Sequence, residues 1–152
     1  MALERNYLLG IKNTATQTVL EGGLITLGTT YRAYEDSDRC GVETFDVSGT
    51  GATLNWSGIY KVTATLVGSG TEAGDVTVQL LANGQPVAGA FSTETITTPD
   101  TELHTFTIDE FMLVDNTRVL NVSSTLAQTL ALQNTGVGAT FTKVTFNVVK
   151  VL

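Results

Sequence analysis

A two-residue alternation of apolar and polar side chains runs through the chain from about residue 40 to its end. Within residues 60–66, the apolar positions Tyr60, Val62, Ala64 and Leu66 are separated by lysine and threonine. Successive side chains of a strand point to opposite faces, so this pattern predicts half-buried β-strands. Similar runs cover residues 76–80, 103–114, 118–123, 129–133 and 140–151. No stretch shows the three- and four-residue apolar spacing of a helix, and the sequence therefore predicts an all-β protein.

The segments between these runs contain turn residues. Asn83-Gly84 lies between two apolar runs and predicts a β-hairpin, because a type I′ turn needs positive φ at both central residues. Residues 29–39 are polar and charged and are predicted to form a loop. In the last run the alternation predicts that Thr142, Val144 and Phe146 share one face. Strands at this spacing are typical of a β-sandwich or barrel.

The composition excludes several classes of protein. Eight Lys and Arg residues against fifteen Asp and Glu give a net charge of −7, so there is no basic surface for nucleic acid or for an anionic membrane. Charged residues are only 15% of the chain, whereas threonine occurs 27 times. Sparse charge protects poorly against self-association, and we therefore expect the protein to assemble with copies of itself.

Few residues are suited to chemistry, and we expect no catalytic residue, no cofactor and no bound metal. His104 has no partner in sequence that suggests a catalytic triad, and Cys40 has only Arg39 as a cationic neighbour. The acidic run Glu35-Asp36-Ser37-Asp38 lacks the full spacing of a calcium loop and is interpreted as solvated. Asn55-Trp56-Ser57 and Asn121-Val122-Ser123 match the glycosylation pattern, which occurs readily by chance in such a chain.

Two segments are candidate contact regions. Residues 1–16 are weakly patterned around an apolar cluster and are predicted to be a separate docking segment, with Tyr7, Leu8, Leu9 and Ile11 as its contact residues. Tyr31 and Tyr34 are candidates for surface recognition. No secretion signal is apparent at the start, so we expect synthesis in the host cytoplasm.

Several motifs point to a known family. Trp56–Val62 resembles the Gly-x-Tyr strand start of jelly rolls such as tumour necrosis factor and the complement one-q globular head, and Leu80–Val87 resembles their Asn-Gly hairpin. Residues 139–151 are similar in length and alternation to their last strand. The similarity is greatest to the bacterial and phage branch, including heads of collagen-like spore-surface proteins. The resemblance covers about residues 17–152 and implies a jelly-roll β-sandwich of about ten antiparallel strands that forms a trimer.

These observations lead to a functional hypothesis and an alternative. The first is a non-enzymatic structural protein of a bacteriophage virion, a capsid decoration or short head fibre that contacts the major capsid protein or another virion component. Its trimer interface is predicted to include Tyr60, Phe141 and Phe146, unless these aromatic residues fill the core. The alternative is an adhesive head that recognises a glycan or protein on the host surface through loops 29–39 and 92–102. A carbohydrate-active enzyme is a weaker third interpretation.

Overall fold

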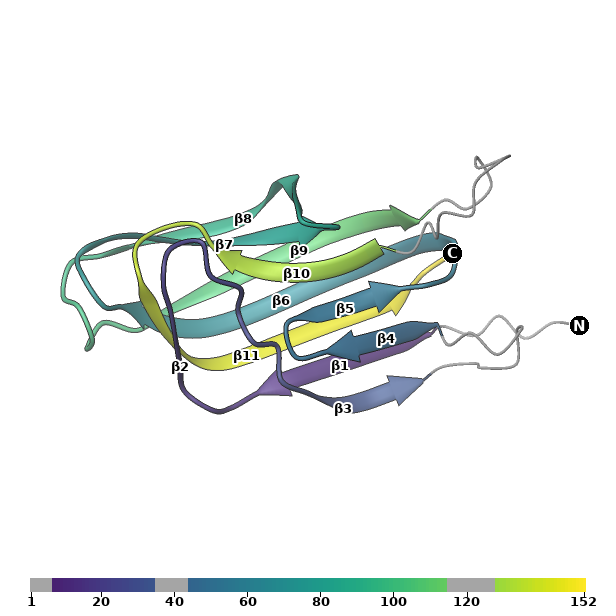
Figure 1. Cartoon of the computed structure of the whole chain (residues 1–152), viewed down its shortest axis with the longest axis horizontal. Helices are drawn as coiled ribbons and strands as arrows, with labels where there is room; N and C mark the ends of the chain where they lie inside the picture. Colours follow the sequence, from purple (N-terminus) through teal and green to yellow (C-terminus); the bar gives the residue numbers. More distant parts are fainter. Residues whose placement is uncertain (1–6, 35–43, 115–127) are drawn as a thin grey trace, which may run out of the picture.

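The computed structural model describes residues 7–34, 44–114 and 128–152, which form two antiparallel sheets (Figure 1). The larger sheet contains β1 (Leu8–Asn13), β2 (Gln17–Val19), β3 (Thr29–Tyr34), β6 (Gly58–Gly70), β9 (His104–Val114) and β11 (Ala139–Lys150). The smaller sheet contains β4 (Phe45–Ser48), β5 (Gly51–Leu54), β7 (Gly74–Ala82), β8 (Gln85–Ile96) and β10 (Gln128–Asn134).

Strands that are distant in sequence lie side by side in both sheets. The order is β3-β1-β11-β6-β9 in the larger sheet, with β2 also paired to β11, and β4-β5-β10-β7-β8 in the smaller one. The alternation predicted a β-sandwich or barrel, and the fold is the jelly-roll β-sandwich that the family resemblance implies. Over the three described ranges every element is a strand, and none of these residues belongs to a helix that could cross a membrane.

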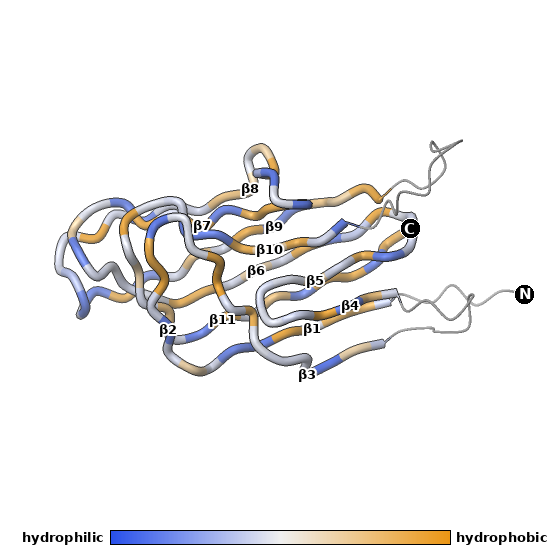
Figure 2. Tube along the Cα trace, viewed as in Figure 1, coloured by the Kyte–Doolittle hydropathy of each residue, from blue (hydrophilic) through white to orange (hydrophobic). Residues whose placement is uncertain are grey.

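The core lies between the two sheets and follows the predicted alternation. In β6, Tyr60, Val62, Ala64 and Leu66 are all fully buried, whereas the residues between them face outward. Hydrophobic and hydrophilic residues alternate along most strands in Figure 2. The Asn83-Gly84 hairpin is also confirmed, because β7 pairs with β8 and both turn residues have positive φ (52° and 78°).

A β-bulge in β11 changes one predicted face. The pairing of β11 with β6 shifts between Phe141 and Lys143, so that Phe141 joins Val144 and Phe146 in the core and Thr142 is exposed. An extra residue in one strand reverses the alternation on one side of the bulge. The sequence-based prediction that Thr142 shares the face of Val144 was therefore wrong.

The N-terminal boundary also needs correction. Leu8–Asn13 is not part of a separate docking segment but a strand between β3 and β11, and its Leu9 and Ile11 side chains are buried. Tyr7 packs against the same core. A docking role for Leu9 and Ile11 is excluded in this fold, because another molecule cannot reach them. The jelly roll begins before residue 17.

The three aromatic residues predicted at a trimer interface belong to the core instead. Tyr60, Phe141 and Phe146 are fully buried inside the isolated chain, which corrects their assignment to a contact between copies. Phe141 packs edge-to-face on Phe106, and Tyr60 packs in the same way on Phe45. Residues 29–34 form edge strand β3 rather than the start of a loop, and residues 92–96 belong to β8.

Candidate assembly face

The outward surface of the larger sheet is the candidate functional site, and we call it the assembly face. Antiparallel pairing aligns its outward side chains in rows across the strands. One row crosses the sheet as Leu8, Val149, Lys61 and Phe111, and Ile59 faces Leu113 beside it. A second row crosses as Lys12, Thr145, Thr65 and Thr107. One end of the face is thus largely apolar and the other carries hydroxyl groups.

The apolar end is unusual because large side chains point away from the core. Phe111 and Leu113 are each 61% exposed, although they lie in a long, regular strand. The prediction of a half-buried strand at residues 103–114 did not single out these two side chains as a contact surface. The signal was present in the run Phe111-Met112-Leu113-Val114, where both faces of the strand are apolar. Large exposed apolar side chains that lie together in this way are typical of an interaction site.

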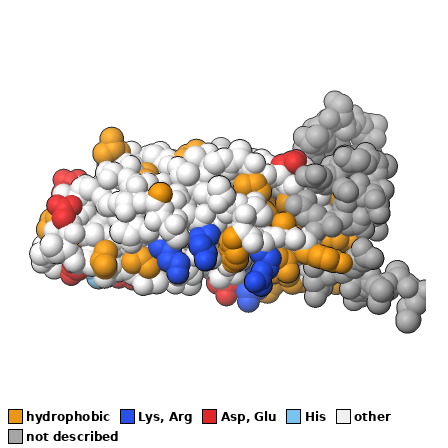
Figure 3. All heavy atoms as spheres, turned by 90° about the horizontal axis from the view of Figure 1, so that it is seen from below, with side chains coloured by type: hydrophobic (Ala, Val, Ile, Leu, Met, Phe, Trp, Pro, Cys, Tyr) orange, Lys and Arg blue, Asp and Glu red, His pale blue; other side chains and the backbone are white. Residues whose placement is uncertain are grey.

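Lysine side chains lie at outward positions along the assembly face. Lys61 belongs to the apolar row, whereas Lys12 and Lys143 lie towards the hydroxyl-bearing end. Asp109 on β9 lies opposite Thr63 and is a neighbour of Lys61. Lys61 pairs with Asp109 at 3.7 Å and lies 5.9 Å from the ring centre of Phe111. Figure 3 shows Lys and Arg side chains gathered beside hydrophobic ones on the side of the molecule seen from below. The outward residues of the assembly face named here, three lysines and one aspartate, therefore contrast with the net negative charge of the chain.

The two tyrosines predicted for surface recognition are exposed, but they lie on β3. Tyr31 is 48% exposed and covers Gly10, and its hydroxyl donates to Asn147 Oδ1 at 2.8 Å. Lys12 Nζ is 5.0 Å from the centre of the Tyr31 ring. Tyr34 is 46% exposed and stacks on Tyr7, with ring centres 6.5 Å apart. Tyr31 is thus fixed on the assembly face by two contacts.

The outward surface of the smaller sheet has a different chemistry. Its threonine hydroxyls pair across the strands, with Thr53 and Thr129 2.9 Å apart and Thr77 and Thr93 2.8 Å apart. Gln79 Nε2 lies within bonding distance of the carbonyl oxygens of Leu80, Val87 and Ala90. One large apolar side chain, Phe91, is 53% exposed there opposite Gln79.

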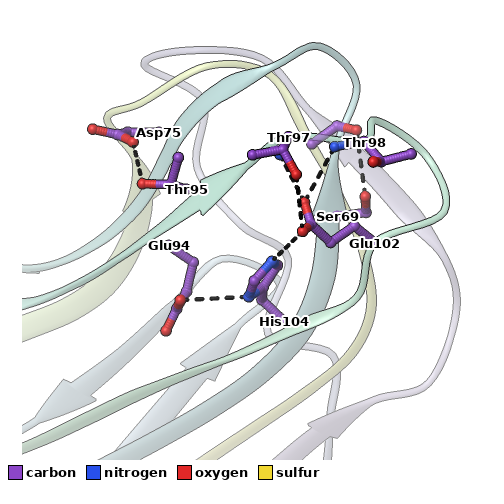
Figure 4. A network of polar contacts seen from close by, with 9 residues as sticks. Ser69, Asp75, Glu94, Thr95, Thr97, Thr98, Glu102 and His104 are labelled. Carbon is purple, nitrogen blue, oxygen red and sulfur yellow. Dashed lines mark hydrogen bonds and ion pairs between the residues drawn. The ribbon is translucent and has the colours of Figure 1, made fainter.

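A polar network joins the edges of the two sheets at β8 and β9 (Figure 4). His104 Nδ1 lies 3.4 Å from Glu94 Oε2 on β8, and Nε2 lies 3.6 Å from Glu102 Oε1. Glu102 accepts hydrogen bonds from the backbone N–H groups of Thr97 and Thr98, which hold the pKa of its carboxyl below the usual value. The network organises the loop before β9.

The remaining candidates add no reactive centre. Asn55, in the first glycosylation motif, donates through Nδ2 to Asp46 Oδ2 at 2.7 Å. No cluster of metal-ligating side chains occurs in residues 7–34, 44–114 and 128–152. Cys40, the acidic run Glu35–Asp38, the strand predicted at 118–123 and the second glycosylation motif at Asn121 lie outside the described residues.

Comparison with known proteins finds similar structures but no similar sequence. No family model matches the chain, and no curated protein matches its sequence. The globular domain of zebrafish complement 1qA is similar with a TM-score of 0.60 and 9% identity, covering 96% of this chain and 98% of the other. Eiger TNF from S. frugiperda gives 0.66 and 9%, covering 97% and 92%. PRD1 vertex protein P5 gives 0.55 and 16%, covering 96% and 97%. The chain therefore has the jelly-roll fold of tumour necrosis factor and complement one-q domains.

Proposed function

We propose that this protein is a non-enzymatic structural component of a bacteriophage virion whose jelly-roll heads form a trimer through the assembly face. The observation that carries the proposal is the exposed apolar end of that face, where Phe111 and Leu113 lie beside the half-buried Ile59. The half-buried Val149 and Leu8 continue the same row on the far side of Lys61. Burying such apolar surface contributes a favourable free energy of about 25 cal/mol per Å², which favours association.

The composition of the two outward surfaces supports this choice of face. Hydroxyl pairs on the smaller sheet are already satisfied within the chain and remain compatible with water. The apolar end of the larger sheet gains most from being covered. A threefold ring joins two different surface patches of each copy, and the assembly face supplies one of them. The trimer itself is what the resemblance to the jelly-roll family implies.

A matched pair of substitutions tests the interface. Phe111→Asp places a carboxylate on the assembly face, and Phe91→Asp places one at a similarly exposed aromatic position on the smaller sheet. Sedimentation velocity of the full chain at micromolar concentration should show a trimer for the wild type and for Phe91→Asp, and a monomer for Phe111→Asp. A monomeric wild type, or a trimer that survives Phe111→Asp unchanged, would contradict the proposal.

The virion location is supported by the likeness to PRD1 vertex protein P5, which covers almost the whole of both chains. We expect gold-labelled antibodies against the purified protein to bind intact particles of the phage that encodes it, with the capsid or a head fibre as the labelled structure. The partner is then the major capsid protein or another virion component. Particles without label, together with a stable trimer in solution, would exclude the virion role and leave the assembly intact.

A second candidate function is adhesion to a glycan or protein of the host surface, favoured by the exposed rings of Tyr31 and Tyr34. Exposed aromatic rings offer stacking surfaces for sugars. Tyr31 lies on the assembly face, so a trimer that covers this face would leave Tyr34, but not Tyr31, available to a glycan. Binding of the trimer to a glycan array, lost in Tyr34→Ala, would favour adhesion over a purely structural role.

A further inference from the structure

The edges of the two sheets meet at a histidine placed between two carboxylates. His104 is the first residue of β9 in the larger sheet, and Glu94 lies on β8 in the smaller sheet. Glu102 belongs to the loop that connects the two strands. The His104 side chain is 25% exposed, against 38% for Glu94 and 30% for Glu102. The three groups therefore interact in a partly desolvated position rather than in bulk water.

The ring nitrogens have different surroundings. Nδ1 approaches Glu94, whereas Nε2 is buried, has no hydrogen-bond partner and lies 3.6 Å from Glu102 Oε1. A neutral imidazole has one N–H and one lone pair, so one carboxylate must face the lone pair. The imidazolium ion has an N–H on both nitrogens and attracts both carboxylates. The geometry thus suits the protonated ring better than the neutral one.

We propose that His104 is a proton-operated clasp that, when protonated, joins the β8 edge of the smaller sheet to the β9 edge of the larger one through Glu94 and Glu102. The clasp also holds the intervening loop, because Glu102 binds the N–H groups of Thr97 and Thr98. The same loop is attached to β6 by the bond from Asp100 N–H to Gly70 O. Protonation therefore fastens the end of the sandwich at which these strands meet.

No other charged group in the described residues is paired with the ring. Residues 66–70 of β6, which run beside His104, contain no ionisable side chain. Asp75 on β7 accepts a hydrogen bond from Thr95 on the outward surface of the smaller sheet. The low pKa of Glu102 keeps this carboxyl ionised throughout the range in which histidines titrate, so it remains a partner for the imidazolium. Acidification from about pH 8 to about pH 5.5 should then close the clasp.

Amide hydrogen exchange of the full-length protein tests the clasp locally. The readout is the protection of the Thr97 and Thr98 N–H groups, each rate being divided by the chemical exchange rate at the same pH. In the wild type we expect this protection to be roughly two- to fivefold greater at pH 5.5 than at pH 8, the effect of a partly exposed ion pair. The Ile25 N–H, bonded to Leu132 O far from the clasp, is the internal control.

Two variants separate the clasp from other causes of pH dependence. His104→Gln keeps a polar side chain without a titrating ring and should abolish the rise in protection on acidification. Glu94→Gln changes a half-buried residue of edge strand β8 to an amide of the same size, for which a folding defect is not expected, and should reduce the rise while leaving Glu102 in place. Equal protection at both pH values in the wild type would overturn the proposal. So would a full rise in either variant. The result is independent of the proposed virion role, because trimer formation is measured separately.

Discussion

The outward surfaces of the two sheets are both built from antiparallel strands, but they differ in the partners that their side chains find within the chain. On the smaller sheet, hydroxyls pair with each other across the strands and Gln79 binds backbone carbonyls. On the assembly face, Phe111 and Leu113 extend into solvent. Apart from the exposed Phe91, the named side chains of the smaller sheet find partners within the chain, whereas the apolar side chains of the assembly face do not. This difference is the reason for proposing the assembly face, rather than the smaller sheet, as the surface that associates.

The largest loss of stability is expected inside the sandwich. Two neighbouring residues of β11 allow the comparison, because one points into the core and the other onto the assembly face. Phe146 is fully buried, whereas Asn147 points outward and accepts a hydrogen bond from Tyr31. Phe146→Ala should lower the free energy of unfolding by about 3–5 kcal/mol, because it removes buried contacts and leaves a cavity. Asn147→Ala should cost about 1 kcal/mol. Urea unfolding at a fixed protein concentration measures both values. Similar losses in the two variants would contradict the assignment of Phe146 to the core rather than to an interface.

A smaller loss is expected when the internal pairing of the smaller sheet is broken. Gln79→Glu replaces the amide that donates to the carbonyls of Val87 and Ala90 with a carboxylate that cannot donate. We expect the free energy of unfolding to fall by about 2 kcal/mol, since these carbonyls lose their donor and face a negative charge. On the assembly face, Asp109→Asn removes only an exposed ion pair with Lys61 and should cost less than about 1 kcal/mol. Equal losses for the two changes, measured by urea unfolding, would remove the contrast between the surfaces.

Strands with one buried face were predictable from the sequence, because their alternation is undisturbed. β6 and the hairpin at Asn83-Gly84 are examples. β1 was not predictable in this way: Leu8 lies in the apolar row of the assembly face and Gly10 is covered by Tyr31, so the first four residues of the strand have no polar side chain on either side. β3 had the opposite problem, since all its residues are exposed and read as a loop. Phe111 and Leu113 were missed for the same reason as β1. The end of β9 is apolar on both faces of the strand and therefore shows no alternation.

The inner side of β6 gives a prediction for alkaline pH. Burial raises the pKa of Tyr60 to about 12, and its hydroxyl donates a hydrogen bond to Trp56 O. The folded state therefore holds this proton more strongly than the unfolded chain, whose tyrosines titrate near pH 10. Stability from this group is complete below about pH 10 and is lost as the pH rises towards 12. The wild type should lose about 1 kcal/mol more than Tyr60→Phe between pH 7 and pH 11, as measured by urea unfolding. At pH 7, Tyr60→Phe should be about 1 kcal/mol less stable than the wild type, because it lacks the hydrogen bond to Trp56 O.

The smallest effect concerns equivalent threonines on the two outward surfaces. Thr65→Val enlarges the apolar area of the assembly face, whereas Thr77→Val removes one member of the hydroxyl pair with Thr93 on the smaller sheet. Both are outward positions in strands, where valine fits as well as threonine, so the folding of each variant should be nearly unchanged. If the assembly face is covered in the trimer, Thr65→Val should tighten association by roughly two- to fivefold, because a hydroxyl no longer has to be desolvated. Thr77→Val should leave association unchanged, since its surface stays in water. The concentration at which trimers dissociate, measured by sedimentation, distinguishes the two. Tighter association of Thr77→Val alone would assign the interface to the smaller sheet and reverse the comparison.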